Sequence, residues 1–200
     1  MSYHNAIPSF RRAMIFIDGE NIVMRFQEMC KIYKVCDHNY PDNAKHEKDV
    51  YLWYSHMVPD IGLHEIVRCT LYTYVQGSDC DRDRIESDIK KLKFWRHGNS
   101  TLPNTITPKI FIKRKGMKAK GVDISISVDA LSHAAKDHYD TAVILSGDGD
   151  YLRLIDEIQS FGKQCYVGSF SEGCHPRMKI VPDMYFSLDD FLFSGVKTKL

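Results

Sequence analysis

Four acidic residues of this 200-residue chain stand where apolar segments end or helical segments begin, and they could act together as one site. They are Asp18, Asp123, Asp148 and Asp150. Four carboxylates held close together repel one another, and the pKa of each rises unless a cation neutralises them. Mg²⁺ and Mn²⁺ prefer carboxylate oxygen and water as ligands, and the sequence has no histidine-rich set that would favour zinc. The residue types therefore predict a site for a hard divalent cation, Mg²⁺ or Mn²⁺.

Each of these acids also has an ordinary structural explanation. Asp18 and Gly19 could form a turn after a strand, and Asp123 could cap a helix. The sequence Ser-Gly-Asp-Gly-Asp at 146–150 is harder to explain as an ordinary turn after a strand. The functional explanation depends on whether the fold brings all four side chains to one place.

Strands and helices alternate along most of the chain. Apolar and β-branched segments predict strands, and apolar residues three or four positions apart predict helices. The expected strands are 13–17, 65–76, 109–115, 141–146 and 163–169, and the expected helices are 21–34, 49–58, 78–98, 121–138 and 150–162. Residues 99–108 are expected to form a loop. This alternation favours parallel βαβ units in a doubly wound sheet.

Ligands of doubly wound sheets bind beyond the carboxyl ends of the strands. Asp18 follows the first expected strand, and Asp123 begins the helix after the third. Asp148 and Asp150 follow the fourth. If the first and fourth strands are neighbours in the sheet, we expect the four carboxylates to converge at one edge.

The composition favours one large globular domain. Apolar residues make up 44% of the chain and the net charge is only +1, so any attraction for a polyanion must be local. We recognise no membrane span and no signal peptide, so we expect a cytoplasmic protein whose six cysteines stay reduced. A zinc site formed by Cys165, Cys174 and His175 is a weaker alternative, because their spacing matches no common zinc pattern.

The segment 113–120 has five basic residues among its eight and leads directly to Asp123. Such a segment could bind the phosphates of a nucleic acid, although a solvated charged segment is the usual alternative. Lys120 is the strongest candidate for a phosphate contact, and the other bases are Lys113, Arg114, Lys115 and Lys118. The sequence Phe-Trp-Arg-His at 94–97 could stack on bases, but packing of its aromatic residues in the core is the favoured explanation.

Three segments in this order resemble the NYN domain in its LabA-like (DUF88) branch. They are FIDGEN (16–21), KGVDISISVDAL (120–131) and YDTAVILSGDGDYLRLI (139–155), and the resemblance covers about residues 13–170. That family is related to the PIN-domain and flap-endonuclease-type nucleases. The resemblance implies an α/β, PIN-like three-layer α/β/α fold with a central, mostly parallel sheet. It also implies acidic metal ligands and cleavage of RNA.

The resemblance assigns roles to residues by their position. Asp18, Asp123, Asp148 and Asp150 match the acidic positions, Asn21 matches the family's asparagine after the first motif, and Asp129 matches a second recurrent acid. Asp129 is six residues from Asp123, about 120° away around a helix, so we expect an outer or structural role for it. Asn21 and Ser146 could orient a ligand or bind a phosphate, and Glu20 is either an outer-shell group or a solvated acid.

These residues support hydrolysis of phosphodiester bonds. Metal ions can activate water, neutralise phosphate charge and stabilise the leaving oxygen. We therefore expect a metal-dependent ribonuclease with single-stranded or structured RNA as its partner. Residues 36–60 look like an insertion and residues 171–200 form a variable C-terminal segment, so the choice of RNA is not fixed by the motifs.

Two other functions compete with this one. A haloacid-dehalogenase-type phosphatase would need a second aspartate two residues after Asp18, where this chain has Glu20. A non-catalytic RNA-binding or interaction module on the same fold is the stronger alternative, although a pure phosphate binder gains nothing from four carboxylates. Association with itself or with a protein partner is left open.

Overall fold

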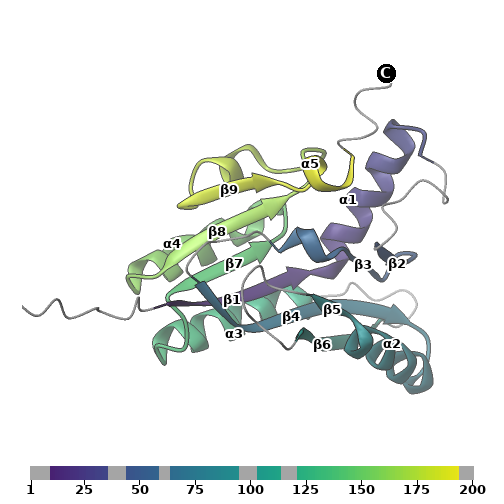
Figure 1. Cartoon of the computed structure of the whole chain (residues 1–200), viewed down its shortest axis with the longest axis horizontal. Coiled ribbons are helices and arrows are strands. Elements are labelled where there is room, and N and C mark those ends of the chain that lie inside the picture. The colour runs from purple at the N-terminus through teal and green to yellow at the C-terminus, as the bar shows by residue number, and fades with distance from the viewer. Residues whose placement is uncertain (1–9, 36–43, 59–63, 95–102, 114–120, 194–200) are drawn as a thin grey trace, which may run out of the picture.

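A seven-stranded sheet forms the centre of the computed structural model, which describes residues 10–35, 44–58, 64–94, 103–113 and 121–193 (Figure 1). All neighbouring strands run parallel except β5 and β6. Across the sheet the strands are β5 (Lys93–Phe94), β6 (Asn104–Lys113), β4 (His64–Gln76), β1 (Arg11–Asp18), β7 (Thr141–Leu145), β8 (Gln164–Ser169) and β9 (Met184–Ser187). The expected mostly parallel α/β sheet is confirmed.

The first and fourth expected strands are neighbours. β1 lies at the centre of the sheet between β4 and β7, and Ile17 is in register with Leu145. Residues 13–17 and 141–145 are all buried, as an inner parallel strand covered on both faces requires. The last residues of β1 and β7 therefore lie side by side, and the segments that follow them begin at the same edge.

Helices cover both faces of the sheet and complete three layers (Figure 1). On one face, α1 (Gly19–Ile32) and α2 (Asp79–Lys91) contribute side chains such as Phe26 and Ile85 to a core with β1 and β4. On the other face, α3 (Val122–Ala135) and α4 (Leu152–Ser160) bury Ile126 and Ile155 against the same strands. Short helices η1 (Ser55–Met57), η2 (Gly149–Tyr151), η3 (Pro176–Lys179) and α5 (Asp189–Leu192) complete the described elements.

The helix expected at 49–58 is wrong. Residues 45–53 form a two-stranded hairpin of β2 (Lys45–Glu47) and β3 (Tyr51–Trp53), and the single helical turn η1 follows. All three residues of β3 are buried, and the Trp53 ring lies 5.5 Å from that of Phe94. A short apolar run that is buried on all sides has no periodicity that distinguishes a strand from a helix.

Two other expected boundaries are also corrected. The helix expected over 78–98 ends at Lys91, because Phe94 is buried in β5 against Trp53. The loop expected over 99–108 is a strand from Asn104 onward, where β-branched Thr105, Ile106 and Thr107 continue β6. Residues 95–102 lie outside the described part, so Trp95, Arg96 and His97 of the aromatic–basic segment cannot be placed.

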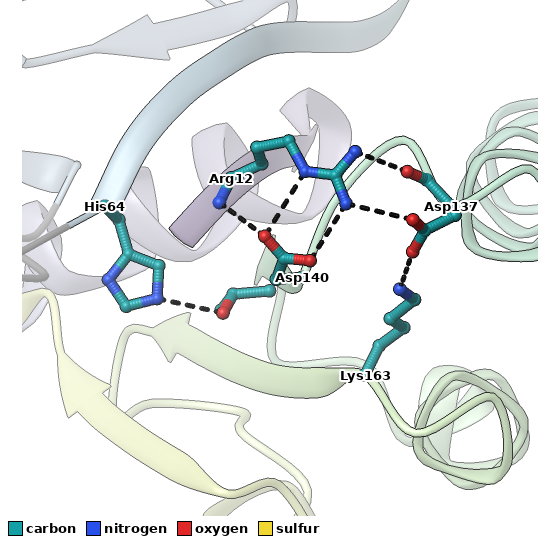
Figure 2. A network of polar contacts seen from close by, with 6 residues as sticks. Arg12, His64, Asp137, Asp140 and Lys163 are labelled. Carbon is teal, nitrogen blue, oxygen red and sulfur yellow. Dashed lines mark hydrogen bonds and ion pairs between the residues drawn. The ribbon is translucent and has the colours of Figure 1, made fainter. Parts of the chain in front are cut away.

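An ion-pair network ties β1 to neighbouring segments at the amino end of the sheet (Figure 2). The Arg12 guanidinium lies 2.9 Å from Asp140, just before β7, and 3.3 Å from Asp137. Lys163, just before β8, also binds Asp137. This network lies at the end of β1 opposite to Asp18, so it anchors the strands without contacting the four acids.

None of the described helices is long and apolar enough to cross a membrane.

Candidate active site

Asp18 is the buried centre of the candidate site. It ends β1 and caps α1, where its Oδ1 accepts a hydrogen bond of 3.0 Å from the backbone N–H of Asn21. Only 3% of the residue is exposed, so its carboxylate faces other side chains instead of bulk water. The capping explanation and the site explanation of Asp18 are therefore compatible, since one oxygen caps the helix and the other faces the loop after β7.

The loop 146–150 is fastened to Asp18 and Asn21. Ser146 Oγ donates a 3.0 Å hydrogen bond to Asp18 Oδ2 and accepts a 3.2 Å bond from the N–H of Asp148. The N–H of Gly147 donates to Asn21 Oδ1 at 3.0 Å. Asn21 and Ser146 thus hold the loop against the start of α1.

Asp148 and Asp150 belong to one tight turn after the strand. Asp148 Oδ1 accepts a 3.0 Å hydrogen bond from the N–H of Asp150, and this bond caps the short helix η2. The side chain of Asp150 lies at the exposed surface. The turn therefore presents one carboxylate that is partly occupied with capping and a second that is open to solvent.

Tyr151 connects two of the four acids, and the sequence analysis did not assign it a role. Its hydroxyl lies 3.2 Å from Asp18 Oδ2 and 3.1 Å from Asp123 Oδ1, as donor to both. Burial and the two carboxylates raise the pKa of Tyr151, so the hydroxyl keeps its proton. The one sequence signal was an aromatic residue directly after Ser-Gly-Asp-Gly-Asp.

Tyr74 positions the helix that carries Asp123. Its hydroxyl oxygen accepts hydrogen bonds from the backbone N–H groups of Gly121 (2.6 Å) and Val122 (2.9 Å). These donors at the start of α3 would otherwise be unsatisfied. A tyrosine on β4 thereby sets where α3 begins and, with it, where Asp123 lies.

The pKa values of buried Asp18 and of Asp123, which is exposed at the start of α3, support their mutual proximity. Burial raises the pKa of Asp18 to about 7, and the charge of Asp123 adds to the rise, although the N–H of Asn21 opposes it. Burial also raises the pKa of Asp123, with further increases from the charges of Asp148, Glu20 and Asp150. The charges of the four predicted acids and of Glu20 therefore influence one another around Asp18 and Asp123.

Asp129 lies apart from these acids. It accepts a 2.6 Å hydrogen bond from the Tyr72 hydroxyl and pairs with Lys109 on β6. Partial burial disfavours its charge, but Lys109 and Tyr72 outweigh that effect and lower the pKa of Asp129. Asp129 thus joins α3 to β4 and β6, in keeping with the structural role expected for it.

One basic residue of the segment 113–120 falls within the described part of the chain. Lys113 ends β6, pairs with Glu20 at 3.0 Å and lies over the Tyr74 ring at 5.5 Å from its centre. Arg114, Lys115, Lys118 and Lys120 lie outside the described residues. Lys113 therefore places the start of the basic segment beside the first turn of α1.

Among the described residues, no three histidine, cysteine, aspartate or glutamate side chains are gathered closely enough to hold a metal ion. The weaker zinc alternative gains no support from these residues, because Cys165 is fully buried in β8. The chemistry around Asp18 nevertheless suits a hard cation, because the hydroxyl oxygens of Ser146 and Tyr151 lie beside its carboxylate, and Tyr151 also contacts that of Asp123.

The family model for the NYN domain matches residues 12–189. The chain belongs to the NYN domain family. This family is part of the PIN-like nuclease superfamily. The matched region contains β1, α3 and the loop after β7, and so all four acids of the candidate site.

A solved structure shares the fold of this NYN domain. It is a protein of unknown function from Vibrio parahaemolyticus RIMD 2210633, with 20% sequence identity and a TM-score of 0.62, and the match covers 94% of this chain and 99% of that one. At this identity the similarity concerns the fold alone. Comparison with curated proteins finds no match.

Proposed function

We propose that this NYN domain, which we place in the LabA-like branch, is a ribonuclease that hydrolyses phosphodiester bonds of cytoplasmic RNA with Mg²⁺ or Mn²⁺. The observation that carries the proposal is the bridge from Tyr151 to both Asp18 and Asp123, in an electrostatic field shared with Asp148 and Asp150. A fold has no structural need to hold further acids beside a buried carboxylate such as Asp18, because the repulsion of like charges destabilises it. A cation and a phosphate that share this site would supply the missing compensation.

The residues that would hold the cation are Asp18, Asp123 and Asp148, with Asp150 as a further ligand or as the holder of a bound water. When bound, such a cation lowers the pKa of water and neutralises phosphate charge. The raised pKa of Asp18 and of Asp123 supports this assignment, since bringing a positive charge near them would relieve an unfavourable state.

The other residues act by positioning. Asn21 and Ser146 keep the loop 146–150 against α1, and Tyr151 fixes the separation of Asp18 and Asp123. We propose that Lys113, Arg114, Lys115, Lys118 and Lys120 bind the phosphates of RNA beside the acids. The pairing of Lys113 with Glu20 supports this, because an RNA phosphate could replace the carboxylate as its partner.

A cleavage assay on labelled single-stranded RNA tests the proposal, with Mn²⁺, Mg²⁺ or EDTA and with wild type beside Asp148→Asn. We expect cleavage that requires the metal and is lost in the variant, with an unchanged thermal unfolding profile. Asp156→Asn is the matched control, because Asp156 is an exposed acid on α4 outside the site. Wild-type turnover by Asp148→Asn would contradict the assignment. RNA binding without cleavage by any form would favour the non-catalytic RNA-binding module.

A further inference from the structure

A hollow of about 1030 Å³ lies between the carboxyl-terminal half of α1 and the β2 segment. Its lining includes Lys31 and Lys34 from α1 and the residues after it, and Lys45 and Lys48 from β2 and the turn that follows. The lysine pocket, as we call these four residues and the hollow between them, is built partly by the inserted region that the NYN motifs do not account for. Figure 1 shows the β2–β3 hairpin beside α1.

The positive charge of the lysine pocket exceeds the negative charge of the described residues that line it. All four lysines are exposed, and none forms an ion pair with a described residue. Five other lysines each have an acidic partner: Lys90, Lys91, Lys109, Lys113 and Lys163. Three described lysines outside the pocket, Lys93, Lys136 and Lys179, also form no ion pair with a described residue, so the pocket is distinguished by the gathering of four such lysines around one hollow.

One described acid lines the lysine pocket, and two acids close to the pocket residues in sequence pair with arginines. Glu28 pairs with Arg25 at 2.7 Å, and Glu47 pairs with Arg84 at 3.0 Å. Asp49, the acidic residue in the lining, accepts a 2.9 Å hydrogen bond from the Gln27 side chain. Four lysines beside the single carboxylate of Asp49 leave a net positive charge, which favours a polyanionic ligand whose binding also releases counterions.

The helix α1 fixes the distance from this pocket to the acids. Asp18 caps its first turn and Lys31 lies in its last turn, 13 residues later. At 1.5 Å per residue the two ends are about 20 Å apart, which is the length of about six nucleotides of a stacked strand. Lysines on flexible side chains suit such a strand, because they bind phosphates as point charges without reading the base sequence.

We propose that the lysine pocket binds the phosphodiester backbone of an RNA strand whose scissile phosphate lies at Asp18, Asp123, Asp148 and Asp150. The inference rests on the proposed function, because the distance to the acids sets the length of RNA that reaches both places. The inserted hairpin thereby extends the RNA-binding surface beyond the family's acidic site and makes binding depend on substrate length.

Fluorescence anisotropy in EDTA tests this without cleavage. The probes are labelled single-stranded RNAs of about 4 and about 12 nucleotides, one too short and one long enough to span about 20 Å. The test variant is Lys31→Gln/Lys45→Gln, and the matched control is Lys90→Gln/Lys91→Gln, which removes the same charge from α2. We expect the test variant to weaken binding of the longer RNA about threefold to tenfold and to reduce its salt slope by about 1.4. The shorter RNA cannot reach the lysine pocket and the basic residues beside the acids together, so it should bind more weakly and lose less affinity in the test variant.

Equal losses in the test and control variants, or an unchanged salt slope, would overturn the proposal. A loss of affinity that is the same for both RNA lengths would also overturn it. So would equal displacement of a bound inorganic tripolyphosphate probe by the shorter and the longer RNA, because that result indicates a site for small anions. The outcome is separable from that of the cleavage assay. A protein that never cleaves RNA can still show the length-dependent lysine effect, and an active one can lack it.

Discussion

The hydroxyl of Tyr151 lies 3.2 Å from Asp18 Oδ2 and 3.1 Å from Asp123 Oδ1, so one proton is shared between two carboxylates. A tyrosine hydroxyl has a single hydrogen and can fully satisfy only one of them at a time. Tyr151 is 1% exposed, so water cannot readily take its place. It therefore sets the distance between two acids that would otherwise move apart.

Tyr151→Phe should lower RNA cleavage while leaving the fold intact. The ring still fills the same space, but Asp18 and Asp123 lose their common donor. We expect a loss of about tenfold to a hundredfold in kcat/KM, corresponding to about 1–3 kcal/mol for an unsatisfied buried acceptor. Steady-state cleavage of labelled RNA measures the effect.

The control for this variant is Tyr139→Phe. Tyr139 is also fully buried against α3, and its hydroxyl donates a 3.0 Å hydrogen bond to the carbonyl oxygen of Ala130. It should cost similar stability and leave kcat/KM unchanged. Equal activity losses in the two variants would show that Tyr151 acts only through general stability.

Asp18 should make the metal-free protein less stable as pH rises. The pKa of Asp18 is about 7 in the folded protein against an ordinary value of 3.8, so the folded state binds the proton more tightly. Between about pH 4 and pH 7 the unfolded state is then the more deprotonated one, and the free energy of unfolding falls with pH until it levels off above pH 7. We expect this fall, on the order of a few kcal/mol, to be absent in Asp18→Asn.

Urea unfolding in EDTA at about pH 5 and about pH 8 measures the contribution of Asp18 as the difference between wild type and Asp18→Asn. Because other groups titrate in both proteins, only this difference is interpreted. A difference that stays constant, or that grows in favour of wild type at the higher pH, would contradict the raised pKa.

Divalent cations should stabilise the protein most at the pH where Asp18 is charged. Ligands that bind the folded state raise its stability by mass action. At about pH 8 we expect Mn²⁺ or Mg²⁺ to raise the Tm of wild type and of the surface control Asp156→Asn, but not of Asp18→Asn or Asp148→Asn. Thermal shift measurements with and without EDTA provide the test. Equal shifts in all four proteins would indicate that the cations act elsewhere.

The neighbouring positions of Asp18 and Asp148 could be predicted from the sequence, because the order of the elements along the chain determines where the two strands end. Asp18 and Asp148 each follow a buried central strand, and the pairing of β1 with β7 brings the two strand ends together. The predicted convergence of the acids required this pairing of the first and fourth strands, and the strand order confirms the pairing. Parallel βαβ connections leave few other arrangements.

The tyrosines could not be predicted, because their partners are distant in sequence. Tyr151 lies 133 residues from Asp18, and Tyr74 lies 47 residues from Gly121. A buried tyrosine in a core segment looks the same whether its hydroxyl binds a carbonyl or a catalytic acid. The β2–β3 hairpin was missed for another reason. Tyr51, Leu52 and Trp53 are all buried, so apolar and polar residues do not alternate along this strand as they would along a half-exposed one.

Gly149 lets a loop pack on the acidic turn. A Cβ atom at this position would lie 2.8 Å from the His175 ring, closer than two such atoms can approach. Gly149→Ala should therefore displace His175, destabilise the protein by about 1–3 kcal/mol and disturb Asp148 and Asp150 on either side. The double variant Gly149→Ala/His175→Ala should be less destabilised than the sum of the single variants, because the ring is gone. Urea unfolding of the four proteins measures this coupling, and strict additivity would show that the two residues do not contact each other.

The network around Arg12 should affect stability but not catalysis. Hydrogen bonds and the charge of Arg12 lower the pKa of Asp140, so this carboxylate stabilises the fold above its unfolded pKa of about 4 and loses that contribution as pH falls further. We expect Arg12→Ala to lower the Tm at neutral pH, with a gap from wild type that narrows below about pH 4. Cleavage per folded molecule should be unchanged, because the network lies at the end of β1 away from Asp18. A loss of activity in Arg12→Ala without a loss of stability would show that the two ends of the strand are coupled, and would contradict the separation proposed here.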